Sequence, residues 1–196
     1  IRRVLGAAMR CVPLMAALFI PLMFGIHRLY IWARPLEGIA DKHLREHLEE
    51  ITKTYLSVNG YIIRAVIYFA IWWGLSYFLT KWSAEQDHPP MRDNSARFKA
   101  LSGPGLILYG FTITFAVIAW IMSLDPSWIS TIFGLAILIG EVLSAMCFAV
   151  VIERILFNYK PMSDMLKPDY VHDHGKWILA FTMVWAYFNF SQWLII

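Results

Sequence analysis

The sequence predicts an all-α protein: a polytopic transmembrane helical bundle of about five spans in a single integral-membrane domain, residues 1–196. Composition is the first reason, because 59% of the residues are hydrophobic and 16% are charged, whereas soluble domains carry roughly 25% charge. The second reason is a series of apolar stretches about 20 residues long, the length that crosses a hydrocarbon core about 30 Å thick. So few charges cannot cover a water-facing surface, and lipid is the natural solvent for this chain.

The expected spans follow the apolar stretches in order. They cover residues 4–26, 58–79, 101–122, 128–152 and 176–196. Pro13 and Pro21 lie inside the first span and should kink it, because proline donates no backbone hydrogen bond. The chain begins at Ile1 without methionine and stops within an apolar run, so we expect a domain that is incomplete at both ends.

Four connections join the spans. In the first, Leu44, Leu48 and Ile51 recur at helical spacing among charged residues, which predicts an amphipathic helix at about 41–54 in the membrane interface. Residues 123–127 are expected to form a tight turn, and residues 80–100 and 153–175 polar loops. Lysine and arginine favour the side that holds these two loops, so we expect both loops to be cytoplasmic.

Several classes of function are not indicated. The net charge of +3 is small and unclustered, so nucleic acid is not an expected partner. Cys11 and Cys147 lie in separate apolar runs, without the spacing of a disulfide framework or of a cysteine-held metal. The sequence also has no glycine-rich nucleotide motif, and its spans lack the paired histidines that would hold a haem. We therefore assign no catalytic residue, no metal and no redox cofactor to this chain.

Glu141 is the first candidate functional residue, because it lies near the middle of the expected span at 128–152. A carboxylate at that depth costs at least a few kcal/mol unless it is protonated, paired or hydrated. This predicts a proton relay. The alternative is a carboxyl group that is hydrogen-bonded to a neighbouring helix and serves packing. Gln192, in the last span, is a candidate companion on the path or a polar contact between helices.

Two polar clusters flank Glu141 in the expected topology. On one side, Asp125 precedes Pro126 and is a candidate mouth of a proton path, with plain turn chemistry as the alternative. On the other side, proton-exchanging side chains crowd residues 169–174, namely Asp169, His172, Asp173 and His174. Imidazole exchanges protons near neutral pH, which favours a proton-collecting surface. An ordinary solvated loop and a metal site are the alternatives.

Tryptophans mark the ends of the expected spans. Trp72, Trp73, Trp120 and Trp128 are candidate quinone contacts, and interfacial anchoring is the alternative. Arg64 lies close enough to the start of the second span to extend its charge into the interface.

Four stretches carry a resemblance to a known family: residues 19–33, 53–64, 114–134 and 172–195. Their most specific parts are Ser-Leu-Asp-Pro-Ser-Trp at 123–128 and Phe-Ser-Gln at 190–192. The chain resembles ActF, a family of membrane subunits of the bacterial alternative complex III that is of the NrfD/polysulfide reductase membrane-subunit type. One departure is Ser127, where family members often have histidine, and this weakens a direct proton role for position 127.

The resemblance implies an internal portion of a longer NrfD-like subunit in the bacterial cytoplasmic (inner) membrane. It implies a place in respiratory or photosynthetic electron transport, beside a paralogous membrane subunit, ActC, and extracytoplasmic subunits that carry iron–sulfur clusters and c-type haems. Quinol would then be oxidised at a partner's site, and this subunit would translocate protons coupled to that oxidation. Two alternatives stay open: a subunit that binds quinone itself, and a non-catalytic scaffold for the extracytoplasmic subunits.

Overall fold

The computed structural model of the chain describes residues 2–35, 42–87, 93–159 and 168–195, with backbone alone at residues 2, 3, 44, 54, 87, 168 and 169. In these ranges the regular structure is helical and contains no strand, so the prediction of an all-α fold is confirmed. Five helical stretches are long and apolar enough to cross a membrane: Val4–Phe24, Val58–Gln86, Ser95–Leu124, Phe133–Leu156 and Tyr170–Ile195. By length and composition, the chain is a multi-pass membrane protein.

Contacts between Cα atoms divide the chain into two compact units. Unit 1 comprises residues 1–9 and 132–196, and unit 2 comprises residues 10–131.

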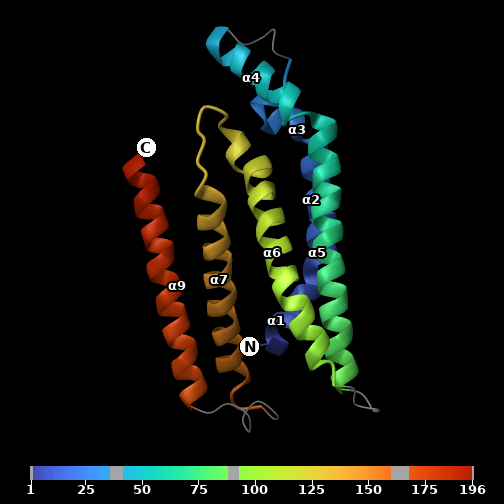
Figure 1. The fold of residues 1–196 in the computed structure, drawn as a ribbon, viewed down its shortest axis with the longest axis vertical. Coiled ribbons are helices and arrows are strands. Elements are labelled where there is room, and N and C mark those ends of the chain that lie inside the picture. Colours follow the sequence, from blue (N-terminus) through green and yellow to red (C-terminus); the bar gives the residue numbers. More distant parts are fainter. Residues whose placement is uncertain (1, 36–41, 88–92, 160–167, 196) are drawn as a thin grey trace. The chain divides into compact units, whose positions relative to one another are not determined.

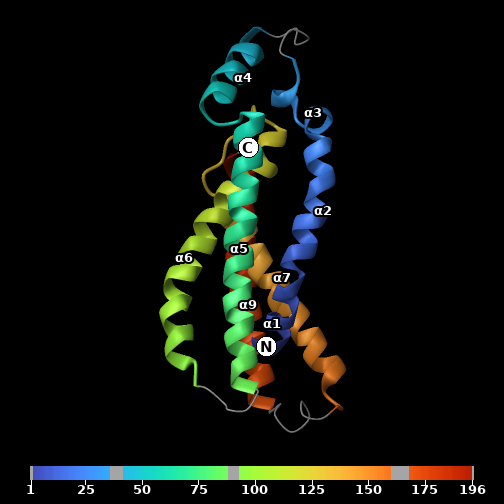
Figure 2. The same cartoon turned by 90° about the vertical axis from the view of Figure 1, so that its right-hand side faces the viewer.

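Unit 1 is built on two long helices, α7 (Phe133–Leu156) and α9 (Pro168–Ile195), which run side by side (Figures 1 and 2). Two contacts set their antiparallel register. Gly140 faces the indole of Trp185, and Glu153 faces His174 thirteen residues further along α7. The short helix α1 (Arg2–Ala8) also packs against α7. Helices of this length bury little of their own surface in a pair, which leaves broad apolar faces for lipid.

Unit 2 contains three long helices. They are α2 (Val12–Phe24), α5 (Val58–Asp87) and α6 (Ser95–Trp120), and α5 packs against both of the others. Shorter elements gather where α2 ends and α5 begins (Figure 2), namely α3 (Ile26–Leu29), η2 (Ile31–Ala33) and α4 (Lys42–Thr54). The 3-10 turn η4 (Met122–Leu124) follows α6. The helix α4 falls within the range expected for an amphipathic helix.

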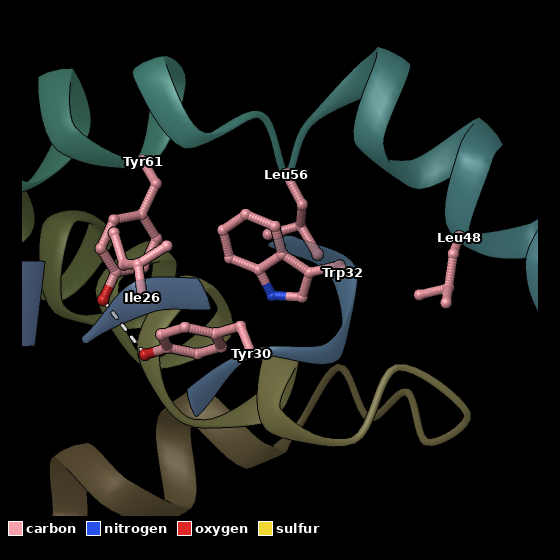
Figure 3. Packing of buried hydrophobic residues seen from close by; sticks show 6 residues of the cluster. All are labelled: Ile26, Tyr30, Trp32, Leu48, Leu56 and Tyr61. Atoms are coloured by element: carbon pink, nitrogen blue, oxygen red, sulfur yellow. Dashed lines mark hydrogen bonds between the residues drawn. The ribbon is translucent and has the colours of Figure 1, made fainter. Parts of the chain in front are cut away.

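The core of unit 2 lies among these shorter elements and the helix ends (Figure 3). Its buried members are Ile26, Tyr30, Trp32, Leu48, Leu56 and Tyr61. Leu48 of α4 belongs to this cluster and Ile51 of the same helix packs against it, which explains why the helix has apolar residues on one side and charges on the other.

The chain reverses direction after α2 at a corner that is closed by its own residues. The Nδ1 atom of His27 lies 2.7 Å from the carbonyl oxygen of Ala33. From the other side, Arg34 donates to the carbonyl oxygens of His27 (3.3 Å) and Arg28 (2.5 Å). These bonds satisfy carbonyl groups that the end of a helix leaves without a partner.

Proline interrupts the first span, as the sequence predicts. A 3-10 segment, η1 (Met9–Cys11), separates α1 from α2, and Pro13 stands at the start of α2. A proline ring clashes with the carbonyl four residues earlier, which here is that of Met9. Pro21 lies inside α2, and the helix ends three residues later at Phe24.

Several helix ends differ from the sequence-based expectation. The expected loop at 80–100 is shorter, because α5 continues to Asp87 and α6 begins at Ser95. The expected loop at 153–175 is also shorter, since α7 reaches Leu156 and α9 begins at Pro168. Hydropathy marks only the part of a helix that crosses hydrocarbon, whereas the backbone ladder continues into the polar region.

The helix α7 begins later in the chain than the sequence predicts. The expected span begins at residue 128, but the helix begins at Phe133. The preceding segment contains Ile129, Thr131 and Ile132, whose branched side chains restrict helical rotamers. The backbone nitrogen of Ser130 instead donates to the sulfur of Met122 at 3.5 Å, which holds this segment in an irregular conformation.

Candidate functional site

A carboxylate–imidazole pair in unit 1 joins α7 to α9. The Nδ1 atom of His174 lies 3.2 Å from Oε2 of Glu153, and Glu153 is 4% exposed. A buried carboxylate without a partner is strongly unfavourable, so it is either protonated or compensated by a charge or donor nearby. The imidazole of His174 is such a partner, because it lies at ion-pair distance from this carboxyl group.

A pocket of about 440 Å³ opens beside this pair within unit 1. Its described lining residues are Val150, Glu153, Arg154, Phe157, Asn158 and Val171. The pocket is amphipathic, with apolar walls and the polar ends of Arg154 and Asn158. Glu153 and Arg154 of α7 and Val171 of α9 all line it.

The cluster predicted at residues 169–174 belongs to the beginning of α9 rather than to a loop. His172 and Asp173 are exposed, and Asp173 pairs with Lys176 at 3.1 Å. Acidic residues near a helix N-terminus are favourable because the helix dipole is positive there. Asp169 lies in α9, but its side chain is outside the described part of the structure. Of this cluster, the structure brings His174 to a buried acid.

Glu141 occupies the middle of α7, as expected from the sequence, but its side chain is exposed in the chain rather than buried. The preceding residue, Gly140, faces α9 at Trp185. One step along a helix turns the side-chain direction by about 100°, so Glu141 points away from that contact. Glu153 lies twelve residues further along the same helix, or about 18 Å at 1.5 Å per residue. Gln192 is half-buried in α9. The relay roles of Glu141 and Gln192 stay predictions.

Asp125 forms a turn in unit 2. Its Oδ1 atom accepts hydrogen bonds from the backbone nitrogen of Ser127, at 3.1 Å, and from the Ser127 hydroxyl. These two donors stabilise the charged form and lower the pKa of the exposed Asp125 carboxyl group. The geometry therefore matches the turn chemistry considered from the sequence, and it keeps this carboxylate ionised at neutral pH. Its role as the mouth of a proton path stays a prediction.

The four candidate tryptophans separate in the structure. The rings of Trp72 and Trp120 meet edge to face, with centroids 5.8 Å apart, and Phe69 packs against both. The indole nitrogen of Trp72 donates to the hydroxyl of Thr112 at 2.9 Å. Trp73 is 58% exposed on α5, and Trp128 lies in the segment before α7. Thus two of the four share an aromatic cluster, and quinone contact by any of them stays a prediction.

Two tyrosines complete this end of unit 2. The hydroxyl groups of Tyr30 and Tyr61 are hydrogen-bonded at 3.1 Å, and Tyr30 also donates to the carbonyl oxygen of Trp120 at 2.8 Å (Figure 3 shows the first bond). Tyr30 is 2% exposed, and burial raises its pKa because the charged phenolate would lose its water. Tyr30 therefore stays neutral at physiological pH, and its two hydrogen bonds tie the corner after α2 to α5 and α6.

No known family model matches the chain. No curated protein is significantly similar to it in sequence either.

Sequence reasoning missed Glu153, because the residue was assigned to the start of a polar loop. A signal was available. An acidic residue in the last turn of a helix is unfavourable against the negative end of the dipole, so its presence there indicates a specific partner. Once α7 is extended to Leu156, Glu153 falls in that last turn. The tyrosine pair carried no comparable signal, since Tyr30 and Tyr61 are ordinary residues of an aromatic-rich membrane protein.

Proposed function

We propose that this chain is a membrane subunit of a quinol-oxidising electron-transfer complex of the alternative complex III type, and that unit 1 carries protons coupled to that reaction. The observation that carries the proton role is the Glu153–His174 pair, a nearly completely buried carboxylate within 3.2 Å of an imidazole at the end of two membrane-spanning helices. Membership of this type of complex is proposed from the resemblance of the sequence to ActF. The quinol would be oxidised at a partner subunit's site.

In this proposal, the pocket beside Glu153 admits protons from one side of the membrane, and the pair holds them. Glu141 is the proposed next group along α7, about 18 Å away, so groups or waters outside this pair must bridge the distance. Ser144 and Cys147 are exposed polar side chains of α7 between the two acids. The proposed partners are a paralogous membrane subunit, ActC, and extracytoplasmic subunits with iron–sulfur clusters and c-type haems.

Membership of such a complex is tested by purification from native membranes through an affinity tag on the full-length protein. Co-purification of c-type haem, seen in the visible spectrum, and of iron–sulfur clusters, seen by electron paramagnetic resonance, is the expected result. A tagged protein that elutes with neither haem nor iron–sulfur clusters would contradict its membership of such a complex.

The proton role is tested in proteoliposomes that contain the purified complex. We expect Glu153→Gln to retain assembly while lowering both turnover and the number of protons moved per electron, since a glutamine cannot take up the shared proton. Glu46→Gln is the matched control, because Glu46 is an exposed carboxylate on α4, and it should behave as the wild type. Equal proton stoichiometry in Glu153→Gln and wild type would show that this pair does not carry protons, even if the complex itself is correctly identified.

A further inference from the structure

Arg64 is a membrane-embedded cation in unit 2. It lies six residues past the start of α5, within the predicted span Val58–Gln86. No carboxylate among the described residues lies within ion-pair distance of its guanidinium group. A charged side chain in a membrane segment normally has a counter-ion or reaches water, so an anion from outside the described residues can neutralise Arg64.

The surroundings of Arg64 hold its guanidinium in one place. Its Nη2 atom donates to the carbonyl oxygen of Tyr55 at 2.8 Å, and its Cζ atom lies 4.1 Å above the centre of the Tyr55 ring. Gly60 leaves room for this arrangement. A Cβ atom at that position would stand 3.2 Å from Nη1 of Arg64 and 2.7 Å from the hydroxyl oxygen of Ser57. A fixed, planar guanidinium loses little freedom when it binds a matching anion.

Most donors of this guanidinium remain available. The group has five N–H donors, and the bond to Tyr55 uses one of them. The Nε atom is buried and has no hydrogen-bond partner within the described residues. The N–H groups on Nη1 and the second N–H on Nη2 are the donors that oxygen atoms of a ligand can reach.

The depth of the guanidinium indicates which anion is available. A helical side chain leans towards the helix N-terminus, and Arg64 reaches back to Tyr55, which precedes α5. The charge therefore lies level with the start of the span, at the border between hydrocarbon and headgroups. Lipid phosphates occupy that level of a bilayer. Phosphate also matches the fork of a guanidinium, because two N–H groups can bond two of its oxygens.

An apolar surface of α5 continues from Arg64 towards the membrane centre. Ile63 and Ile67 are 59% and 48% exposed, and both lie within about 100° of Arg64 around the helix axis. Gly74 lies further along the same side, and a Cβ atom there would meet nothing within 4 Å. An acyl chain attached to a phosphate at Arg64 can lie along these residues.

We propose that Arg64, held by Tyr55, binds the phosphate of an anionic phospholipid whose acyl chains lie along Ile63 and Ile67. A phosphatidylglycerol headgroup carries one negative charge, which neutralises the guanidinium. This site is separate from the Glu153–His174 pair, and it does not depend on the function proposed above.

The test measures lipid binding to the intact, delipidated protein by native mass spectrometry, with phosphatidylglycerol as the probe. We expect Arg64→Gln to raise the dissociation constant of the most tightly bound phosphatidylglycerol by about tenfold or more, the effect of losing a bidentate charged contact. Arg28→Gln is the matched control, because Arg28 is exposed at the corner after α2, and it should leave the constant unchanged. Equal affinity in wild type and Arg64→Gln overturns the proposal.

Two further measurements distinguish a lipid phosphate from free phosphate at this site. A phosphate-free galactolipid should bind wild type and Arg64→Gln equally, and discrimination between the two proteins by this lipid would overturn the phosphate assignment. Inorganic phosphate at millimolar concentration should not displace phosphatidylglycerol, because it lacks acyl chains. Complete displacement would show that the site takes free phosphate instead of lipid.

If Arg64→Gln does not fold, Arg64→Lys tests the binding of phosphatidylglycerol instead. Lysine retains the charge but has no planar fork, so its phosphatidylglycerol affinity should fall to a value between those of wild type and an uncharged variant. An affinity equal to that of wild type would contradict a two-pronged contact by the guanidinium.

Discussion

The imidazole of His174 pairs the second turn of α9 with the last turn of α7, because its Nδ1 atom lies 3.2 Å from Oε2 of Glu153. The same two helices meet again at Gly140 and Trp185. One polar and one steric contact thus fix how far one helix can slide along the other.

This pairing predicts strong coupling between the two side chains. We expect His174→Ala to destabilise the protein by about 1–3 kcal/mol, since it removes the imidazole that lies beside a buried carboxyl group. In a Glu153→Gln background, the same replacement should have a smaller effect, with a coupling energy of at least about 1 kcal/mol. Denaturant unfolding of the four proteins in detergent, followed by circular dichroism, measures the cycle. Additive effects would show that the two side chains do not interact.

The tyrosine pair of unit 2 predicts an asymmetric response to loss of a hydroxyl group. Tyr30→Phe removes the bonds to both Tyr61 and the carbonyl oxygen of Trp120, so it should destabilise by about 1–3 kcal/mol. Tyr61→Phe should have a smaller effect, because Tyr30 keeps its bond to Trp120. Thermal unfolding of the two variants compares them directly, and an equal or reversed order would contradict the assigned roles.

The raised pKa of Tyr30 predicts loss of stability in alkali. The folded state holds the phenol proton more tightly than the unfolded state does, whose pKa is near 10. The tighter binding of this proton therefore adds fully to the free energy of unfolding below about pH 10, and this stabilisation is lost as the pH rises towards the folded-state pKa. The free energy of unfolding, measured between pH 8 and 11.5, should decline more steeply for the wild type than for Tyr30→Phe. If the free energy of unfolding declines equally with pH in both proteins, Tyr30 does not cause the loss of stability in alkali.

Asn94 should stabilise the end of the α5–α6 pair. It is 3% exposed, and its Nδ2 atom donates to the carbonyl oxygen of Trp82 (3.2 Å) and to Glu85 (3.0 Å). We expect Asn94→Ala to cost about 1–3 kcal/mol and to speed amide hydrogen exchange in the last turn of α5. Arg97→Gln is the control, since Arg97 is largely exposed and 3.7 Å from Glu85, and it should change stability by less than about 1 kcal/mol. A larger effect of Arg97→Gln than of Asn94→Ala would reverse this assignment.

Gly140 should tolerate little added volume. A Cβ atom there would stand 3.3 Å from Nε1 and 3.4 Å from Cδ1 of Trp185, so Gly140→Ala requires a small shift of the indole. Gly140→Leu should be worse by about 1–3 kcal/mol, because overpacking separates α7 from α9. Gly175→Leu is a suitable control, since nothing lies within 4 Å of a Cβ atom at that position. The comparison is made by thermal unfolding in detergent, and equal melting temperatures for Gly140→Leu and the control would contradict close packing here.

Much of the architecture follows from the sequence alone. Apolar length located all five membrane-crossing helices, and the start of α5 at Val58 coincides with the expected boundary. The polar extensions of α5 and α6 were missed, since hydropathy does not report where a helix continues in water. They are held by contacts such as that of Asn94 with Glu85, which joins the residue before α6 to the end of α5. The start of α7 was misplaced because apolar, branched residues satisfy a hydropathy pattern without favouring a helix.

The candidate site was predictable only in part. His174 stood out as a titratable residue next to a span, but its partner could not be known before the antiparallel register of α7 and α9 was set. Glu141 stood out by depth in the span, and the sequence did not indicate which way its side chain points. That direction depends on which face of α7 contacts α9, and this in turn depends on one small residue, Gly140, opposite one large residue, Trp185.

The self-closed corner after α2 has a consequence for how the protein is made. Its hydrogen bonds join residues six or seven positions apart, from His27 to Ala33 and from Arg34 back to His27 and Arg28. Contacts this local form quickly and need no later part of the chain. During synthesis, the corner can therefore close before Tyr61 and Trp120 have left the ribosome. The side chain of Tyr30 would then be in place first. When α5 and α6 insert into the membrane, Tyr61 and Trp120 would bind to a tyrosine that is already positioned.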